Sequence, residues 1–172
     1  MKNITSVGII MGSDSDLEVM SGTAQILESF GVAYEMSVIS AHRSPELAHN
    51  YAVNARKRGL KVIIAGAGGA AHLAGVMASL TTLPVIGIPV KAKTLDGLDS
   101  LLSTAQMPHG VPVATVGINA SKNAGLLAIQ ILAVSDSKIE KKLSEYKSKM
   151  SSDIGKKNKK LTKIGYKKYL DK

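Results

Sequence analysis

Residues 33–48 have the sequence AYEMSVISAHRSPELA, which passes from one kind of secondary structure to another through a polar loop. The segment 33–39 alternates apolar and polar residues, which is the pattern of a β-strand. Ser44 and Pro45 then occupy the positions of a helix N-cap and a first helical residue, so we expect a helix to begin at Pro45. A strand followed directly by a helix is the repeating unit of an α/β fold.

The rest of the chain repeats this alternation. Further strands are predicted at 7–11, 62–65, 85–88 and 113–116, and helices at 17–30, 45–58, 72–81, 96–105 and 123–134. Because most of these strands are apolar on both faces and are separated by helices, we expect a parallel sheet that helices cover on both sides. The predicted fold class is therefore α/β, a three-layer αβα sandwich of flavodoxin-like or Rossmann-like type.

Composition limits the chemistry that such a domain can carry. The chain of 172 residues has no cysteine, which excludes disulfides, thiolate metal ligands and cysteine nucleophiles. Its four histidines lack metal-binding spacing, so no metal site is expected. No stretch approaches the roughly 18 apolar residues of a membrane span, and the first residues do not resemble a secretory signal. We therefore expect a cytoplasmic protein with no membrane partner.

The formal net charge of +9 is concentrated near the C-terminus. Residues 1–135 contain nine basic and eight acidic residues, whereas residues 136–172 contain thirteen and five. We expect a single α/β domain over 1–150 that includes a C-terminal helix at 138–150, followed by a Lys-rich, flexible tail at 151–172. Nucleic acid is not an expected partner, but a nucleotide- or RNA-binding module that uses the basic tail is left open as an alternative.

Two strand-end loops carry the first candidate site residues. His42 follows a strand, and open α/β sheets bind ligands at the carboxyl ends of their strands. Ser13 and Ser15 place hydroxyl and backbone N–H groups at a helix N-terminus, which suits a phosphate or ribose hydroxyls, although a plain N-cap cluster is the alternative. Asp16 is assigned to ribose hydroxyls or to orientation, and Arg43 can supply the cation that a phosphate needs.

The glycine run at 66–69 forms neither a P-loop nor a dinucleotide-binding fingerprint. Its density of glycine and alanine predicts a backbone that closely approaches a flat ligand, with a tight strand-to-helix turn as the alternative. His72 either faces the same pocket or caps the next helix. His49 and His109 are weaker candidates, because one lies on a helix surface and the other in a Pro/Gly loop.

Four motifs together carry a family resemblance. They are MGSDSD at 11–16, SAHRSP at 40–45, AGAGGAAHL at 65–73 and DSLLSTAQMP at 99–108. Over about residues 5–150 the chain resembles the class I 5-(carboxyamino)imidazole ribonucleotide mutase family of purine (IMP) biosynthesis. The resemblance implies an isomerase without a cofactor that moves a carboxylate from the exocyclic nitrogen to carbon 4 of a small-molecule ribonucleotide.

The resemblance also implies roles for individual residues. His42 would act as the catalytic acid and base, for which histidine is suited because its ordinary pKa lies near neutrality. A dry pocket is expected behind the glycine-rich wall, so that released carbon dioxide does not escape. The residues expected to bind the ribonucleotide are Ser13, Ser15, Asp16, Ser40, Ala41, Arg43, Gly68, Gly69, Ala70, His72 and Leu73. Family members form homo-octamers, in which the C-terminal helix packs on neighbouring subunits.

The sequence departs from the family pattern in three places. His109 stands where members often carry arginine, the 119–122 turn is unusually polar, and the lysine-rich extension from 151 has no recognised counterpart.

The competing enzymatic hypothesis is the class II relative, which carboxylates aminoimidazole ribonucleotide with free carbon dioxide. The 99–108 motif favours class I.

Overall fold

The computed structural model describes residues 5–170, and its centre is a five-stranded parallel sheet. The strands are β1 (Val7–Met11), β2 (Tyr34–Val38), β3 (Val62–Gly68), β4 (Val85–Val90) and β5 (Ala114–Thr115). Their spatial order is β2-β1-β3-β4-β5, which is the flavodoxin-like order. Ile9, Ile10, Ile63 and Ile64 on neighbouring strands are completely buried, as expected for a sheet covered on both faces. The predicted fold class is confirmed.

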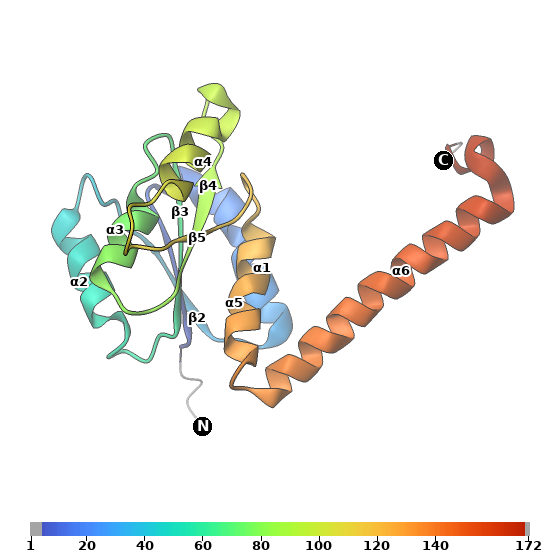
Figure 1. Ribbon diagram of the computed structural model, residues 1–172, viewed down its shortest axis with the longest axis horizontal. Coiled ribbons are helices and arrows are strands. Elements are labelled where there is room, and N and C mark those ends of the chain that lie inside the picture. The colour runs from blue at the N-terminus through green and yellow to red at the C-terminus, as the bar shows by residue number, and fades with distance from the viewer. Residues whose placement is uncertain (1–4, 171–172) are drawn as a thin grey trace. The chain divides into compact units, whose positions relative to one another are not determined.

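Helices cover the two faces of this sheet (Figure 1). One face carries α1 (Leu17–Phe30) and α5 (Ser121–Ala133), and the other carries α2 (Pro45–Ala55), α3 (Leu73–Leu80) and α4 (Leu98–Ala105). A Cβ atom on Gly66 of β3 would collide with Met20 of α1, and a Cβ atom on Gly87 of β4 would collide with Thr104 of α4. Glycine at these two positions therefore lets one helix on each face approach the sheet closely.

The local signals at helix ends are only partly confirmed. Gly31 ends α1 in the left-handed conformation with φ 72°, as the glycine after Phe30 predicts. Pro45 is the first residue of α2, but Ser44 makes no side-chain capping hydrogen bond. Its hydroxyl instead donates to the Ser40 carbonyl at 2.9 Å, which closes the preceding loop.

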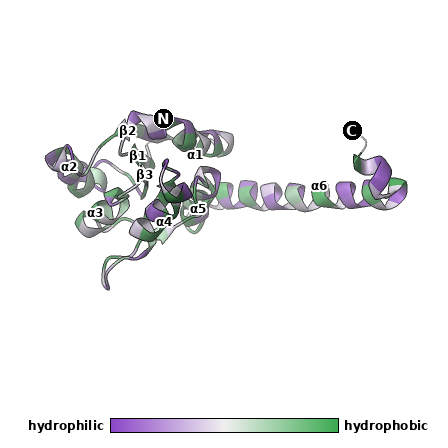
Figure 2. Cartoon of the chain, turned by 90° about the horizontal axis from the view of Figure 1, so that it is seen from above, coloured by the Kyte–Doolittle hydropathy of each residue, from purple (hydrophilic) through white to green (hydrophobic). Residues whose placement is uncertain are grey.

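The chain divides into one unit that ends at Leu132 and a second that begins at Ala133. The second unit contains α6 (Ser137–Leu170), along which hydrophilic and hydrophobic residues alternate (Figure 2). The predicted helix end at Met150 is wrong, because the helix continues through the lysine-rich segment. Lysine, leucine and isoleucine tolerate helical backbone well, and Lys156 pairs with Asp153 one turn earlier at 3.4 Å.

Gly165 interrupts the helical geometry of α6 with φ 72° and ψ 161°.

The assignment of residues 1–150 to one domain stays a prediction. Within residues 5–170, no helix combines the length and the apolar character that crossing a membrane would require.

Candidate active site

Four strand-end loops meet at one edge of the sheet. Met11 at the end of β1 is in register with Val38 of β2 and with Gly66 of β3, so the loops that follow these strands begin at about the same level. A cavity of about 960 Å³ opens at this edge, next to the β1/β3 switch point where the strand order reverses. Ten of the predicted substrate-binding residues and His42 line it: Ser13, Ser15, Asp16, Ser40, Ala41, His42, Arg43, Gly68, Gly69, Ala70 and Leu73.

The loop after β1 is a short 3-10 turn, η1 (Asp14–Asp16), held by a reciprocal capping arrangement. The Ser13 hydroxyl accepts from the Ser15 N–H at 3.4 Å, and the Ser13 N–H donates to Asp16 Oδ2 at 3.1 Å. The N-cap cluster that was considered as the alternative to a binding site is therefore present, and the same side chains also face the cavity. Burial raises the pKa of the Asp16 carboxyl above its ordinary value of 3.8, with the Ser13 N–H acting in the opposite direction.

Arg43 joins the loop after β2 to the loop after β1. Its Nη2 atom donates to the Gly12 carbonyl at 2.9 Å, and its Nε atom donates to the Ser40 hydroxyl at 3.4 Å. The Arg43 charge also opposes the rise in the pKa of Asp16, which places the two groups in one electrostatic environment. The guanidinium remains exposed on the cavity wall.

His42 and His72 contact each other directly. The Nε2 atom of His42 lies 3.0 Å from the Nδ1 atom of His72. The two rings meet edge to face, with their centroids 5.1 Å apart. One nitrogen must donate and the other accept, so a single hydrogen lies between the rings. His72 does not line the cavity, and it makes no side-chain cap at the start of α3. Its contact is with His42.

The glycine-rich wall needs glycine for reasons of backbone geometry. Gly69 has φ 66°, and a Cβ atom on Gly68 would come within 3.2 Å of the Val90 carbonyl oxygen. The tight-turn alternative therefore explains both positions. The same residues also form a cavity wall, so the turn and the wall are one feature.

A single chain does not form the water-free pocket that was expected beside the glycine-rich wall. The side chains of His42 and His72 are exposed, and so are Gly68 and Ala70, whereas Leu73 is buried. Glycine and alanine are too small to cover neighbouring groups, so the wall by itself leaves the two imidazoles open to water.

Sequence reasoning missed several residues of the cavity. Lys91 and Lys93, on the loop after β4, line it together with Asn119. Asn119 Oδ1 accepts from the Lys91 N–H at 2.8 Å, and the Lys91 ammonium pairs with Asp96 at 2.7 Å. The sequence did contain a signal for the two lysines. They follow the strand predicted at 85–88, and the carboxyl ends of parallel strands lie at one edge of the sheet.

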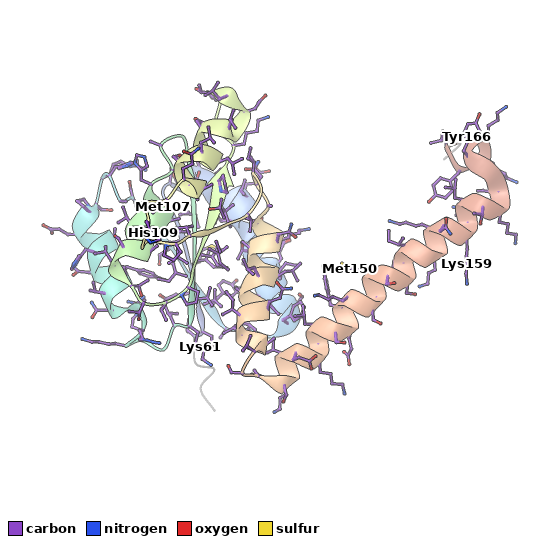
Figure 3. All side chains as sticks on the ribbon, viewed as in Figure 1. Lys61, Met107, His109, Met150, Lys159 and Tyr166 are labelled. Carbon is purple, nitrogen blue, oxygen red and sulfur yellow. The ribbon has the colours of Figure 1, made fainter. Side chains whose placement is uncertain are left out.

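The remaining histidines lie outside this cavity. His49 is exposed on α2, and His109 lies with Met107 on the loop that leads to β5 (Figure 3). His109, the position at which family members often carry arginine, therefore does not line the cavity within one chain. Among the described residues, no group of three or more histidine or carboxylate side chains could hold a metal ion.

Comparison with known proteins agrees with this geometry. The profile of a family described as AIR carboxylase matches residues 6–153. The chain belongs to the AIR carboxylase family. A family member from Thermotoga maritima, named N5-carboxyaminoimidazole ribonucleotide mutase, is 59% identical over 165 residues, which are 96% of each chain. A Pyrococcus abyssi protein of the same name is 60% identical and covers 96% of this chain and 95% of its own.

Solved structures from this family share the fold. The crystal structure of Treponema denticola PurE superposes with a TM-score of 0.80 at 28% identity, covering 94% of this chain and 99% of that one. The Thermotoga match includes 165 of the 172 residues, so at most seven lie outside it. Most of the lysine-rich extension therefore has a counterpart in that relative, contrary to expectation.

Proposed function

We propose that the protein is an N5-carboxyaminoimidazole ribonucleotide mutase of purine biosynthesis, acting on a small-molecule ribonucleotide in the cytoplasm. The relatives that are 59% and 60% identical over nearly the whole chain carry this name. The observation that carries the proposal is the position of His42, on a cavity formed by three of the four family motifs.

The nucleotide lies across the strand-end loops. Its phosphate contacts Ser13, Ser15 and the Arg43 guanidinium, and its ribose hydroxyls contact Asp16. The aminoimidazole ring lies against the Gly68–Ala70 wall, with Ser40, Ala41 and Leu73 at its edges. The substrate is anionic at both its phosphate and its carbamate, so the positive charges of Lys91 and Lys93 favour its entry.

The chemistry needs one group that first gives and then takes a proton. His42 protonates the carbamate nitrogen as the bond from nitrogen to the carboxylate carbon breaks, and that electron pair stays on nitrogen. Carbon dioxide is released beside the enamine-like carbon 4, which attacks it and forms the new carbon–carbon bond. His42 then removes the proton from carbon 4 and returns to its starting state. No cofactor takes part.

His72 acts on His42 and not on the nucleotide. The 3.0 Å contact holds the orientation of the His42 ring and engages its Nε2 atom, whichever of the two imidazoles carries the shared hydrogen. This assignment differs from the expectation that His72 binds substrate, and it follows from the position of His72 outside the cavity lining.

Retention of carbon dioxide requires a cover, which we assign to neighbouring subunits of a homo-octamer. Leu17, Val38 and Leu47 lie next to the site loops and are 48%, 51% and 52% exposed, which suits a subunit contact. Light scattering on the purified protein is expected to give eight times the chain mass of 18.0 kDa. A monomer that turns over substrate would remove this part of the proposal.

His42→Asn tests the mechanism. Asparagine cannot transfer the proton at neutral pH, so turnover is expected to fall by at least about 10²–10⁴-fold, while the oligomeric mass stays unchanged. The matched control is His49→Asn, which removes an exposed imidazole outside the cavity and is expected to keep full activity. Normal turnover by His42→Asn would exclude His42 from the reaction.

A substrate comparison separates the mutase from the class II activity. The purified protein is expected to convert the carboxyamino nucleotide without added bicarbonate. It is expected to be slow with aminoimidazole ribonucleotide and bicarbonate. The reverse preference would assign it to the carboxylases.

A further inference from the structure

The fourth family motif, at 99–108, lines no part of the cavity, yet it contacts the cavity wall from behind. The Gly69 N–H donates to the Ser100 hydroxyl at 2.8 Å. That hydroxyl donates in turn to the Val90 carbonyl at 2.8 Å, at the end of β4. Ser100 is completely buried, so neither bond is replaced by water. One hydroxyl of α4 thus joins the wall to the adjacent strand.

Ser103, one turn later on α4, contacts the same wall at two further points. Its hydroxyl accepts from the Ala71 N–H at 3.1 Å and lies 3.1 Å from the Gly69 carbonyl, to which it can donate. It also lies 2.6 Å from the carbonyl of Asp99, one turn earlier in the helix. These contacts tie the 69–71 turn to α4.

The held turn borders the cavity and leads directly into His72, one member of the imidazole pair. Gly69 lines the cavity in a left-handed conformation, and Ala71 directly precedes His72, which contacts His42. A displacement of this turn would move both the wall and the ring that orients His42. Buried backbone groups need some partner. The hydroxyls of Ser100 and Ser103 also fix where those groups lie, and the Thr104 hydroxyl adds a longer bond of 3.4 Å to the Ala71 carbonyl.

We propose that Ser100 and Ser103 are positioning residues, which hold the glycine-rich wall where released carbon dioxide stays beside carbon 4. This inference rests on the proposed mutase function. Without the serine contacts, the turn has space to shift, and carbon dioxide escapes before carbon 4 attacks it. The bound nucleotide then either leaves as aminoimidazole ribonucleotide or is carboxylated by carbon dioxide from the solvent, and a purely structural role of the serines would give neither outcome.

The experiment follows the carboxylate carbon. Substrate labelled with ¹³C in its carboxylate is converted in buffer that contains unlabelled bicarbonate, and mass spectrometry measures the label in the product. Wild type is expected to keep most of the label. Ser103→Ala is expected to lose it, with kcat reduced by about 10- to 100-fold. KM is expected to change little, because the proposed phosphate and ribose contacts lie on other loops.

Two further variants separate positioning from folding. Ser103→Thr keeps the hydroxyl at a partly exposed position and is expected to restore label retention. Ser79→Ala removes a hydroxyl that bonds within α3 to the Val76 carbonyl at 2.9 Å and is expected to behave as wild type. Ser100→Ala is expected to lose label as Ser103→Ala does.

The outcomes distinguish this inference from the proposed function. Absence of mutase turnover in wild type would overturn the function itself. Wild-type turnover together with full label retention and unchanged kcat in folded Ser103→Ala would overturn only the positioning role. Equal loss of label in Ser103→Thr and Ser103→Ala would also overturn it, since the hydroxyl would then be irrelevant.

Discussion

Asp16 combines a stability cost with a proposed binding role. Asp16 is only 8% exposed, and one of its carboxylate oxygens accepts a hydrogen bond from the Ser13 N–H at 3.1 Å. Burial raises the pKa of its carboxyl, and the nearby Asp14 charge adds to the rise, while Ser13 and Arg43 reduce it. A raised pKa means that the folded protein holds this proton more tightly than the unfolded chain does.

The sign of the resulting pH dependence can be tested with Asp16→Asn. The free energy of unfolding contributed by Asp16 falls as pH rises from the ordinary pKa of 3.8 through the raised one, and it stays lower above it. Asparagine does not ionise, so the variant is expected to have a higher Tm than wild type at pH 7. The difference should shrink as the pH approaches 3.8 from above.

Thermal unfolding across this pH range, together with nucleotide titration, measures both effects. Affinity for the ribonucleotide is expected to fall, because the charged acceptor for the ribose hydroxyls is lost. A Tm difference that does not change with pH would contradict the assignment of the stability cost to the Asp16 charge.

Packing between elements depends on where glycine lies. In α5, a Cβ atom on Gly125 would lie 3.0 Å from Ile26 Cβ and 3.2 Å from the Thr23 carbonyl oxygen, both in α1. In α6, a Cβ atom on Gly155 would meet nothing within 4 Å among the described residues. The same substitution should therefore have opposite effects in the two helices.

Gly125→Ala and Gly155→Ala form a matched pair. Alanine in place of a helical glycine gains about 0.5–1 kcal/mol, because glycine loses more freedom on folding. Overpacking at the α1–α5 contact costs about 1–3 kcal/mol, so Gly125→Ala is expected to lower Tm. Gly155→Ala is expected to slow hydrogen exchange in α6 without lowering Tm. Stabilisation by Gly125→Ala would show that α5 can move away from α1.

The elements that sequence predicted best are those with a strong apolar pattern. Runs such as 62–65 and 85–88 became buried strands, because two covered faces require apolar residues throughout. The run at 113–116 forms only a two-residue pairing, since β5 lies at the sheet edge and, within residues 5–170, pairs with β4 alone. The end of α6 was missed because a lysine-rich composition is shared by solvated helices and by coil.

The same reasoning explains the site. His42, Arg43 and the glycine-rich wall were predicted because their types are unusual at strand ends. The contact of His72 depends on the geometry of the 69–71 turn, which composition does not specify. Ser100 and Ser103 are common residues in a helix, and only the three-dimensional structure reveals that their hydroxyls reach the wall.

At the scale of the whole molecule, charge is concentrated on one helix. Helix α6 contains twelve lysines and three acidic residues. At 100° per residue, Lys138, Lys142, Lys149, Lys156, Lys160 and Lys163 share one face. Leu143, Met150 and Leu161 lie on another, and Met150 and Lys159 project from different sides of the helix (Figure 3). The apolar stripe can therefore contact protein while the lysine face stays in solvent.

A chain that ends at Met150 tests what the lysine-rich segment does. Every residue proposed to bind the nucleotide precedes this segment, so turnover is expected to remain. Retention on a heparin column is expected to fall, with a weaker dependence on salt, because each lost cation–anion contact lowers the salt exponent by about 0.7–0.9. A second variant keeps the full chain and carries Lys156→Gln, Lys160→Gln and Lys163→Gln. It removes three charges without shortening the helix, so it separates the effect of charge on retention from the effect of helix length. Loss of turnover in the shortened chain would assign the segment to the enzyme itself.

The position of the charge also bears on solubility. Twelve of the 22 basic and three of the 13 acidic residues lie on α6, which leaves ten of each elsewhere. At neutral pH the remainder of the chain is electrically balanced, so its copies do not repel one another at long range, whereas the helices do. Colloidal stability therefore depends on the charge of a single helix. Its dependence on ionic strength is that of exposed lysines, screened within about 10 Å at 0.1 M salt.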